Sequence, residues 1–116
     1  MPVISDLAAD PGLRSLSCRI LVPLDLPVFR GHFPTTPIVP GVIQVGWAVE
    51  LARAHGLSRG RFTGISSAKF RRLVQPGMRL AARLEPGTRQ GLLQFRFESG
   101  NAIVSTGRLQ FGDGRD

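Results

Sequence analysis

Residues 29–41 read Phe-Arg-Gly-His-Phe-Pro-Thr-Thr-Pro-Ile-Val-Pro-Gly, and an almost wholly apolar stretch follows them to Ala54. Three prolines stiffen this segment, because each fixes its own φ and restricts the residue before it. His32 is therefore expected on a loop with little freedom. Pro40-Gly41 marks a helix start, where unpaired N–H groups and the positive end of the helix dipole gather. A histidine base beside such a helix end is suited to removing a proton next to a carbonyl group.

The one strongly predicted helix covers residues 41–55. It is apolar nearly all round, and only Gln44, Glu50 and Arg53 interrupt the apolar sequence. A helix without a broad polar face must be covered on several sides. In a chain of 116 residues we expect a curved sheet around it, with a partner subunit as further cover. His55-Gly56 is a usual signal for a helix end.

The rest of the chain reads as strands. Residues 13–22 form one, 25–30 a short extended piece, and further strands lie near 61–73, 77–85, 90–98 and 101–111, with Pro-Gly or Gly-Asn turn signals between them. One helix followed by an antiparallel meander is an α+β arrangement. Residues 1–116 are expected to form one domain, with 1–12 and 112–116 peripheral or disordered.

The net charge is +7, with fourteen arginines and a single lysine. Nucleic acid, an anionic membrane or an acidic protein would each explain such a balance. The arginines are dispersed, no base-stacking motif is present, and no apolar run is long enough to span a bilayer. We therefore expect neither a nucleic-acid partner nor membrane insertion, although a generally basic surface explains most of the arginines equally well.

Other composition signals narrow the class of protein. The single Cys18 excludes an internal disulfide framework, and its neighbours Leu16 and Ile20 predict a buried thiol on a strand. The N-terminus lacks the pattern of a signal peptide, so a cytoplasmic location is expected. Two histidines, one cysteine and no paired acids at ligand spacing predict no metal site, and no glycine-rich phosphate loop is present. No cofactor is expected.

The motif Gly31-His32-Phe33-Pro34, followed by Pro37 and then Pro40-Gly41-Val42, resembles the β-hydroxyacyl-acyl carrier protein dehydratases of fatty acid and polyketide synthesis. Residues 24–29 and 69–77 resemble the family too, and the likeness covers roughly residues 13–110. The run 42–48 resembles more narrowly the dehydratase-like proteins encoded with aryl-polyene pigment pathways. The resemblance implies a hotdog fold, in which an antiparallel sheet wraps one long central helix, and a homodimer joined through a continuous sheet.

The resemblance also implies roles for individual residues. His32 would be the general base, and the Gly41 N–H would bind the thioester carbonyl of an acyl carrier protein or acyl-CoA substrate. Substrate contacts are expected from Phe33, Val42, Gln44, Gly46 and Trp47. Lys69, Arg71 and Arg72 would contact the carrier protein. The alternatives are a histidine that only satisfies loop carbonyls, a glycine needed for close packing, and a solvated basic strand edge.

One departure from the family matters most. The family places a Glu or Asp fourteen residues after the histidine, and this chain has Gly46 there. Gly46 serves either helix-on-sheet packing or a widened acyl tunnel. Glu50 lies one turn further on the same helix face, and it replaces the acid, holds a water, or pairs with Arg53 or Arg72. Gln44 is expected to contact substrate or orient water.

Three functions follow from these observations. The first is a dehydratase acting on a 3-hydroxyacyl thioester, with His32, Glu50 or a water returning the second proton. The second is a hotdog thioesterase, in which Glu50 directs a water at the carbonyl. The third is a non-catalytic module that binds a carrier protein or completes a heterodimer whose other subunit supplies the acid. Gly46 favours the second and third functions over the first.

Overall fold

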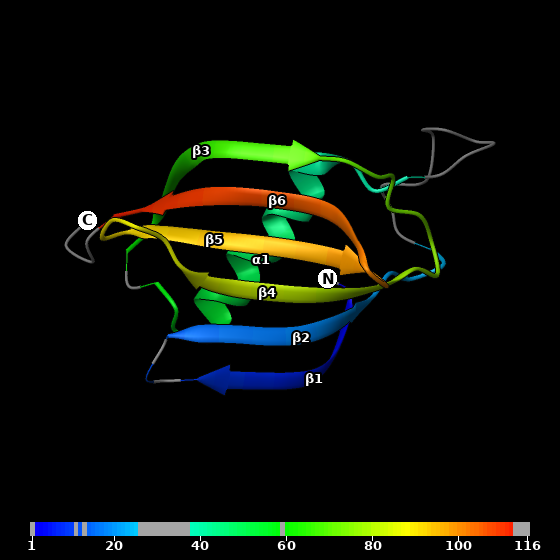
Figure 1. The fold of residues 1–116 in the computed structure, drawn as a ribbon, viewed down its shortest axis with the longest axis horizontal. Helices are drawn as coiled ribbons and strands as arrows, with labels where there is room; N and C mark the ends of the chain where they lie inside the picture. Colours follow the sequence, from blue (N-terminus) through cyan, green and yellow to red (C-terminus); the bar gives the residue numbers. More distant parts are fainter. Residues whose placement is uncertain (1, 11, 13, 26–37, 59, 113–116) are drawn as a thin grey trace.

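The computed structural model describes residues 2–10, 12, 14–25, 38–58 and 60–112. Its elements are, in chain order, β1 (Val3–Asp10), β2 (Ser15–Leu21), α1 (Gly41–Ala54), β3 (Phe62–Phe70), β4 (Arg79–Pro86), β5 (Leu92–Ser99) and β6 (Ala102–Phe111). All neighbouring strands are antiparallel, in the order β1-β2-β4-β5-β6-β3. The helix lies across one face of this sheet (Figure 1). The α+β arrangement predicted from the sequence is confirmed.

Both ends of α1 agree with the sequence signals. Pro40 precedes the helix in an extended conformation (φ −60°, ψ 154°), and His55 is the C-terminal cap. Gly56 follows with φ 70°, in the left-handed region that glycine adopts without strain. The prolyl φ and the glycine therefore fix where this helix begins and ends.

The core lies between α1 and the inner face of the sheet. Trp47, Ala48 and Leu51 of the helix are buried, as are the inward side chains of the central strands. On β5, Phe95 and Phe97 point inward, with ring centroids 5.1 Å apart. Gly107 is the β6 partner of Phe95, and a Cβ atom there would collide with the Phe95 ring. The alternation of apolar and polar residues predicted for 92–98 thus separates the inner from the outer face of β5.

Cys18 is also part of this core. It is buried on β2, as predicted, and burial raises the pKa of its thiol above the ordinary value of 9.0 because the thiolate would lose its hydration. The thiol is therefore a packing group and not a nucleophile at neutral pH.

The strand β1 was not predicted. Residues 1–12 were expected to be peripheral or disordered, and Val3–Asp10 instead forms an edge strand paired with β2, with a register shift between Ser5 and Ala8. The strand is peripheral, as expected, and nearly all its side chains are exposed. Backbone hydrogen bonds to β2 hold this strand. Because it has no buried face, its sequence lacks the alternating apolar pattern that would predict a strand. Residues 113–116 lie outside the described residues.

The sheet covers only one side of α1. Val42 is 74% exposed, and Gly46, Glu50 and Arg53 are exposed on the same side of the helix. These positions recur at helical spacing, so they form one stripe directed away from the sheet. Among the described residues, no helix combines the length and apolar character needed to cross a membrane.

Candidate active site at the start of the central helix

The start of α1 has backbone hydrogen-bond donors without a backbone acceptor among the described residues. No side chain caps it, and its first turn holds no acidic residue. The N–H groups of Ile43 and Gln44 both donate to the Pro40 carbonyl, at 3.0 and 3.2 Å. Within the described part of the chain, the N–H groups of Gly41 and Val42 have no backbone acceptor. This end of the helix can therefore receive an anionic oxygen.

A pocket of about 200 Å³ opens at this helix start. Its lining comes from two segments far apart in the sequence, namely Ile38, Val39, Pro40, Gly41 and Gln44, and Phe70, Arg71, Arg72, Leu73 and Val74. The Val39 N–H donates to the Val74 carbonyl at 2.7 Å, which joins the two segments. The structure thereby brings the predicted oxyanion donor beside two of the three predicted carrier-binding cations.

Strand β6 holds the second segment in place. The N–H groups of Arg71 and Arg72 both donate to the Val104 carbonyl, at 2.8 and 3.3 Å. Val104 is fully buried and lies where the β5–β6 register shifts. The backbone that carries the two arginines is therefore fixed, while their side chains remain exposed.

Gly41 packs closely against Phe70. A Cβ atom at position 41 would lie 2.7 Å from Cζ of the Phe70 ring, which is closer than such atoms approach. The predicted packing role of this glycine is therefore present in the structure, and it leaves the predicted oxyanion role possible because no described residue accepts a backbone hydrogen bond from the Gly41 N–H. Phe70 was not predicted as a site residue, although it lies within the segment 69–77 that resembles the family.

Gln44 is buried in the same pocket. Its side chain is 3% exposed, and its Nε2 donates to the Val39 carbonyl at 3.1 Å. Its Oε1 is buried and has no hydrogen-bond partner among the residues that the structure describes. A buried acceptor without a donor is costly, so this oxygen is suited to receiving a water or a substrate hydroxyl. The bond to Val39 also orients the chain leading into the helix.

Gly46 and Glu50 belong to the exposed stripe of α1. No atom of the described residues lies within 4 Å of the position that a Cβ atom of Gly46 would take. Packing of the helix on its own sheet therefore does not require this glycine. Within the described part of the chain, Glu50 forms no ion pair, with neither Arg53 nor Arg72 as a partner. The described structure therefore gives no support to helix-on-sheet packing as the role of Gly46, or to an ion pair of Glu50 with Arg53 or Arg72.

The structure places only some of the remaining predicted site residues. His32 and Phe33 fall outside the described residues. Trp47 is buried in the core and does not line the pocket at the helix start. Lys69 lines a separate hollow on the opposite face of the sheet, which Arg71 also lines. Among the described residues, no group of three or more metal-ligating side chains comes together.

The family model described as ApeI-like, ApeI dehydratase, matches residues 10–108 of the sequence. The chain belongs to this dehydratase family. Among curated relatives, the 3-hydroxyacyl-acyl-carrier-protein dehydratase FabZ of Acetivibrio thermocellus is 38% identical over 105 residues, covering 84% of this chain and 67% of its own. FabZ of Syntrophotalea carbinolica is 41% identical over 110 residues, covering 87% of this chain and 71% of its own.

A solved structure agrees with the family. The dehydratase heterocomplex ApeI:P of Xenorhabdus doucetiae contains a chain with a TM-score of 0.84 and 27% identity, and the match covers 95% of this chain and 96% of that one. Together with the observed sheet and helix, these comparisons confirm the hotdog fold and the family that the motif around His32 predicted.

Proposed function

We propose that the protein is a dehydratase that removes water from a 3-hydroxyacyl thioester, carried by an acyl carrier protein or coenzyme A. One observation carries the proposal. In a chain of the dehydratase family, the uncapped start of α1 at Gly41 opens into a pocket flanked by Arg71 and Arg72. Such a helix end stabilises the negative charge that develops on a thioester oxygen when a proton leaves the neighbouring carbon.

In this mechanism His32 removes the proton from C2 of the substrate. The Gly41 N–H binds the thioester oxygen as its negative charge grows. The C3–O bond then breaks, the C2–C3 double bond forms, and the hydroxyl group takes up a proton and leaves as water. Imidazole has an ordinary pKa near 6.5, so His32 is suited to act as the base around neutral pH.

The helix itself suggests a source for the second proton. Glu50 lies about 6 Å along the axis from Gly46, and side chains on a helix lean toward its N-terminus. The space next to Gly46 is open in the described structure. We therefore propose that the Glu50 carboxyl group acts across this space, directly or through a water, and that His32 or water alone are the alternatives.

The predicted substrate contacts are part of the same proposal. The orphan Oε1 of Gln44 supports a contact with a substrate hydroxyl or a water, and the open stripe at Val42 and Gly46 supports an acyl chain passing along the helix. Phe33 and Trp47 remain expected contacts. Carrier binding by Arg71 and Arg72 at the pocket, with Lys69 nearby, follows from their positive charge.

We also propose that a second subunit completes the site. Val42, at the start of the exposed stripe on α1, is an apolar side chain that is 74% exposed and that its own sheet does not cover. A cytoplasmic homodimer is expected, with the histidine loop of one subunit near the helix of the other. The solved ApeI:P structure is a dehydratase heterocomplex. A different chain of the same fold is therefore the alternative partner. Synthesis of an aryl polyene is one process that such a dehydratase would serve.

A thioesterase is the second candidate, and Gly46 favours it because hydrolysis requires no acid at that position. The test is to incubate the protein with crotonyl and 3-hydroxybutyryl thioesters. Hydration or dehydration supports the dehydratase, release of free thiol supports the thioesterase, and neither reaction supports a binding module.

A further inference from the structure

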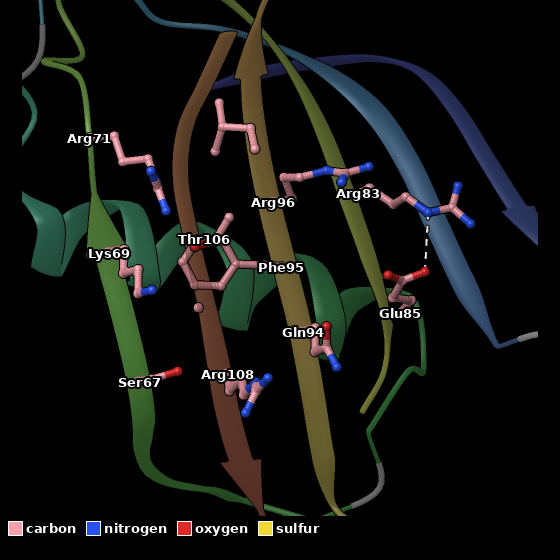
Figure 2. A pocket seen from close by; sticks show the side chains of 12 residues that line it. Ser67, Lys69, Arg71, Arg83, Glu85, Gln94, Phe95, Arg96, Thr106 and Arg108 are labelled. Atoms are coloured by element: carbon pink, nitrogen blue, oxygen red, sulfur yellow. Dashed lines mark hydrogen bonds and ion pairs between the residues drawn. The ribbon is translucent and has the colours of Figure 1, made fainter. Parts of the chain in front are cut away.

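The face of the sheet opposite α1 carries a hollow of about 500 Å³. Figure 2 shows the side chains that line it, with the helix behind the strands. They come from β3, β4, β5 and β6 and from the residue after β3. The lining comprises Ser67, Lys69, Arg71, Arg83, Glu85, Gln94, Phe95, Arg96, Ile103, Thr106, Gly107 and Arg108.

Positive charge dominates this outer-face hollow. Its lining contains five cations and a single carboxylate, that of Glu85. Arg83 pairs with Glu85 at 3.3 Å, and Arg96 pairs with Glu98 at 2.8 Å. Lys69, Arg71 and Arg108 form no ion pair within the described part of the chain. The described residues therefore leave the charge in the half of the hollow nearest β3 without a neutralising partner.

The pairing register of the strands places these cations close to one another. Thr106 on β6 lies directly between Arg96 on β5 and Lys69 on β3, and Arg108 is two residues further on the same face. Arg83 and Arg96 are direct cross-strand partners. Like charges opposite one another in a sheet destabilise it. An anionic partner seated over Thr106 would offset this repulsion.

The chemistry of the face favours an acidic protein over other anions. Its one aromatic residue, Phe95, is 2% exposed and belongs to the core, so the described face offers no ring for stacking nucleic-acid bases. Ile103, 38% exposed, is the one exposed large apolar side chain in the described lining of the hollow, which gives little for insertion into a membrane. The planar guanidinium group of arginine can form two parallel hydrogen bonds with one carboxylate group. The arginines of this face therefore favour a partner that presents carboxylates.

The spacing suits a helix in particular. Neighbouring strands lie about 4.8 Å apart, so β4 to β3 spans roughly 15 Å. A helix advances about 5.4 Å per turn. An acidic helix lying across the strands would therefore present about one carboxylate to each strand.

We propose that the outer-face hollow is a docking surface for an acidic helix of the carrier protein, which rests on the proposed function for the identity of that partner. Arg71 lines both this hollow and the pocket beside Gly41. The positive surface is thus continuous around the end of β3, from the candidate active site to the outer face. Docking would extend from the pocket to Arg96 and Arg108, beyond the predicted cluster of Lys69, Arg71 and Arg72.

The test compares two double variants with equal change in net charge. Arg96→Glu with Arg108→Glu reverses the charge within the hollow, and Arg61→Glu with Arg89→Glu reverses two exposed arginines outside it. Binding of a purified, unacylated acyl carrier protein is measured by fluorescence anisotropy at low salt, after circular dichroism has shown equal folding. We expect at least a tenfold loss of affinity for the first variant and less than twofold for the control.

Other outcomes would overturn the inference. Equal losses of carrier affinity in both variants would show that binding depends only on the net charge of the protein. Unchanged affinity of the first variant would show that the hollow is not part of the interface. Binding of a short duplex DNA that is lost only in the first variant, with no binding of carrier protein, would assign the face to nucleic acid. Wild-type protein that binds the carrier through this face yet converts no carrier-free thioester would contradict the proposed function and leave the docking surface supported.

Discussion

The individual residues that decide the chemistry are Gly46 and Glu50. The family acid is missing at position 46, and the structure places open space there instead of a packed neighbour. Glu50 lies one turn away on an exposed face without an ion pair in the described residues. A carboxylate without a structural partner is free to serve a reaction, so this residue is the most informative one to change.

Glu50→Gln should lower the rate of dehydration on the order of a hundredfold if its carboxyl group donates the second proton, because general acids typically contribute 10²–10⁴-fold. The change keeps the shape of the side chain and removes its proton. Steady-state rates with a 3-hydroxybutyryl thioester measure the effect. Glu85→Gln, on the outer face of the sheet, is the matched control and should leave the rate unchanged when the thioester is free of carrier protein. Full activity of Glu50→Gln would leave His32 or water as the acid.

Among the elements, the central helix was the most predictable. Pro40-Gly41 and His55-Gly56 mark its ends in the sequence, and its apolar run required burial. β1 was unpredictable because its side chains are exposed and backbone pairing alone holds it. The site was partly predictable. Gly41 and Arg71 were each singled out, but their common pocket depends on the pairing of β3 with β6 and the bond from Val39 to Val74.

The outer-face hollow was hidden from the sequence for a similar reason. Lys69, Arg96 and Arg108 lie on three different strands, and each alone reads as an ordinary polar position of an alternating strand. The order β5-β6-β3 makes them neighbours of Thr106. Local patterns identify which residues face outward, whereas strand order decides which of them meet.

Gly46→Ala tests what the glycine does within the helix. With no atom within 4 Å of the new Cβ, the substitution should raise the free energy of unfolding by about 1 kcal/mol per subunit, because glycine is poorer than alanine in a helix interior. Denaturant titration measures this change. If an acyl chain passes over Gly46, activity should fall while stability rises. Lower stability would instead show that a partner subunit packs against the glycine.

At the scale of the whole molecule, the uncovered apolar surface is the main feature. Val42 and Leu73 are 74% and 60% exposed, and Ile65 and Phe70 on the edge strand β3 are 48% and 46% exposed. In the described structure β3 pairs only with β6, so its other edge is open. Open edges and exposed apolar patches are typical of subunit interfaces.

Light scattering at micromolar concentration should therefore give a mass about twice the 12.6 kDa of one chain. The mass should change little with salt if apolar surface and strand pairing hold the dimer. Ile65→Lys, which places a charge at the open edge of β3, should shift the protein toward monomer. A monomeric wild-type protein would contradict the homodimer and direct attention to a second hotdog chain as partner.

The most direct test of the central claim is the hydration of a carrier-free crotonyl thioester, followed by loss of enoyl absorbance and by mass spectrometry of the product. Wild-type protein should form the 3-hydroxyacyl thioester with the thioester bond intact, and His32→Ala should lower the rate at least a hundredfold while keeping the same mass and fold. Cleavage of the thioester, no reaction, or an unchanged rate in His32→Ala would contradict a dehydratase that uses His32 as its base.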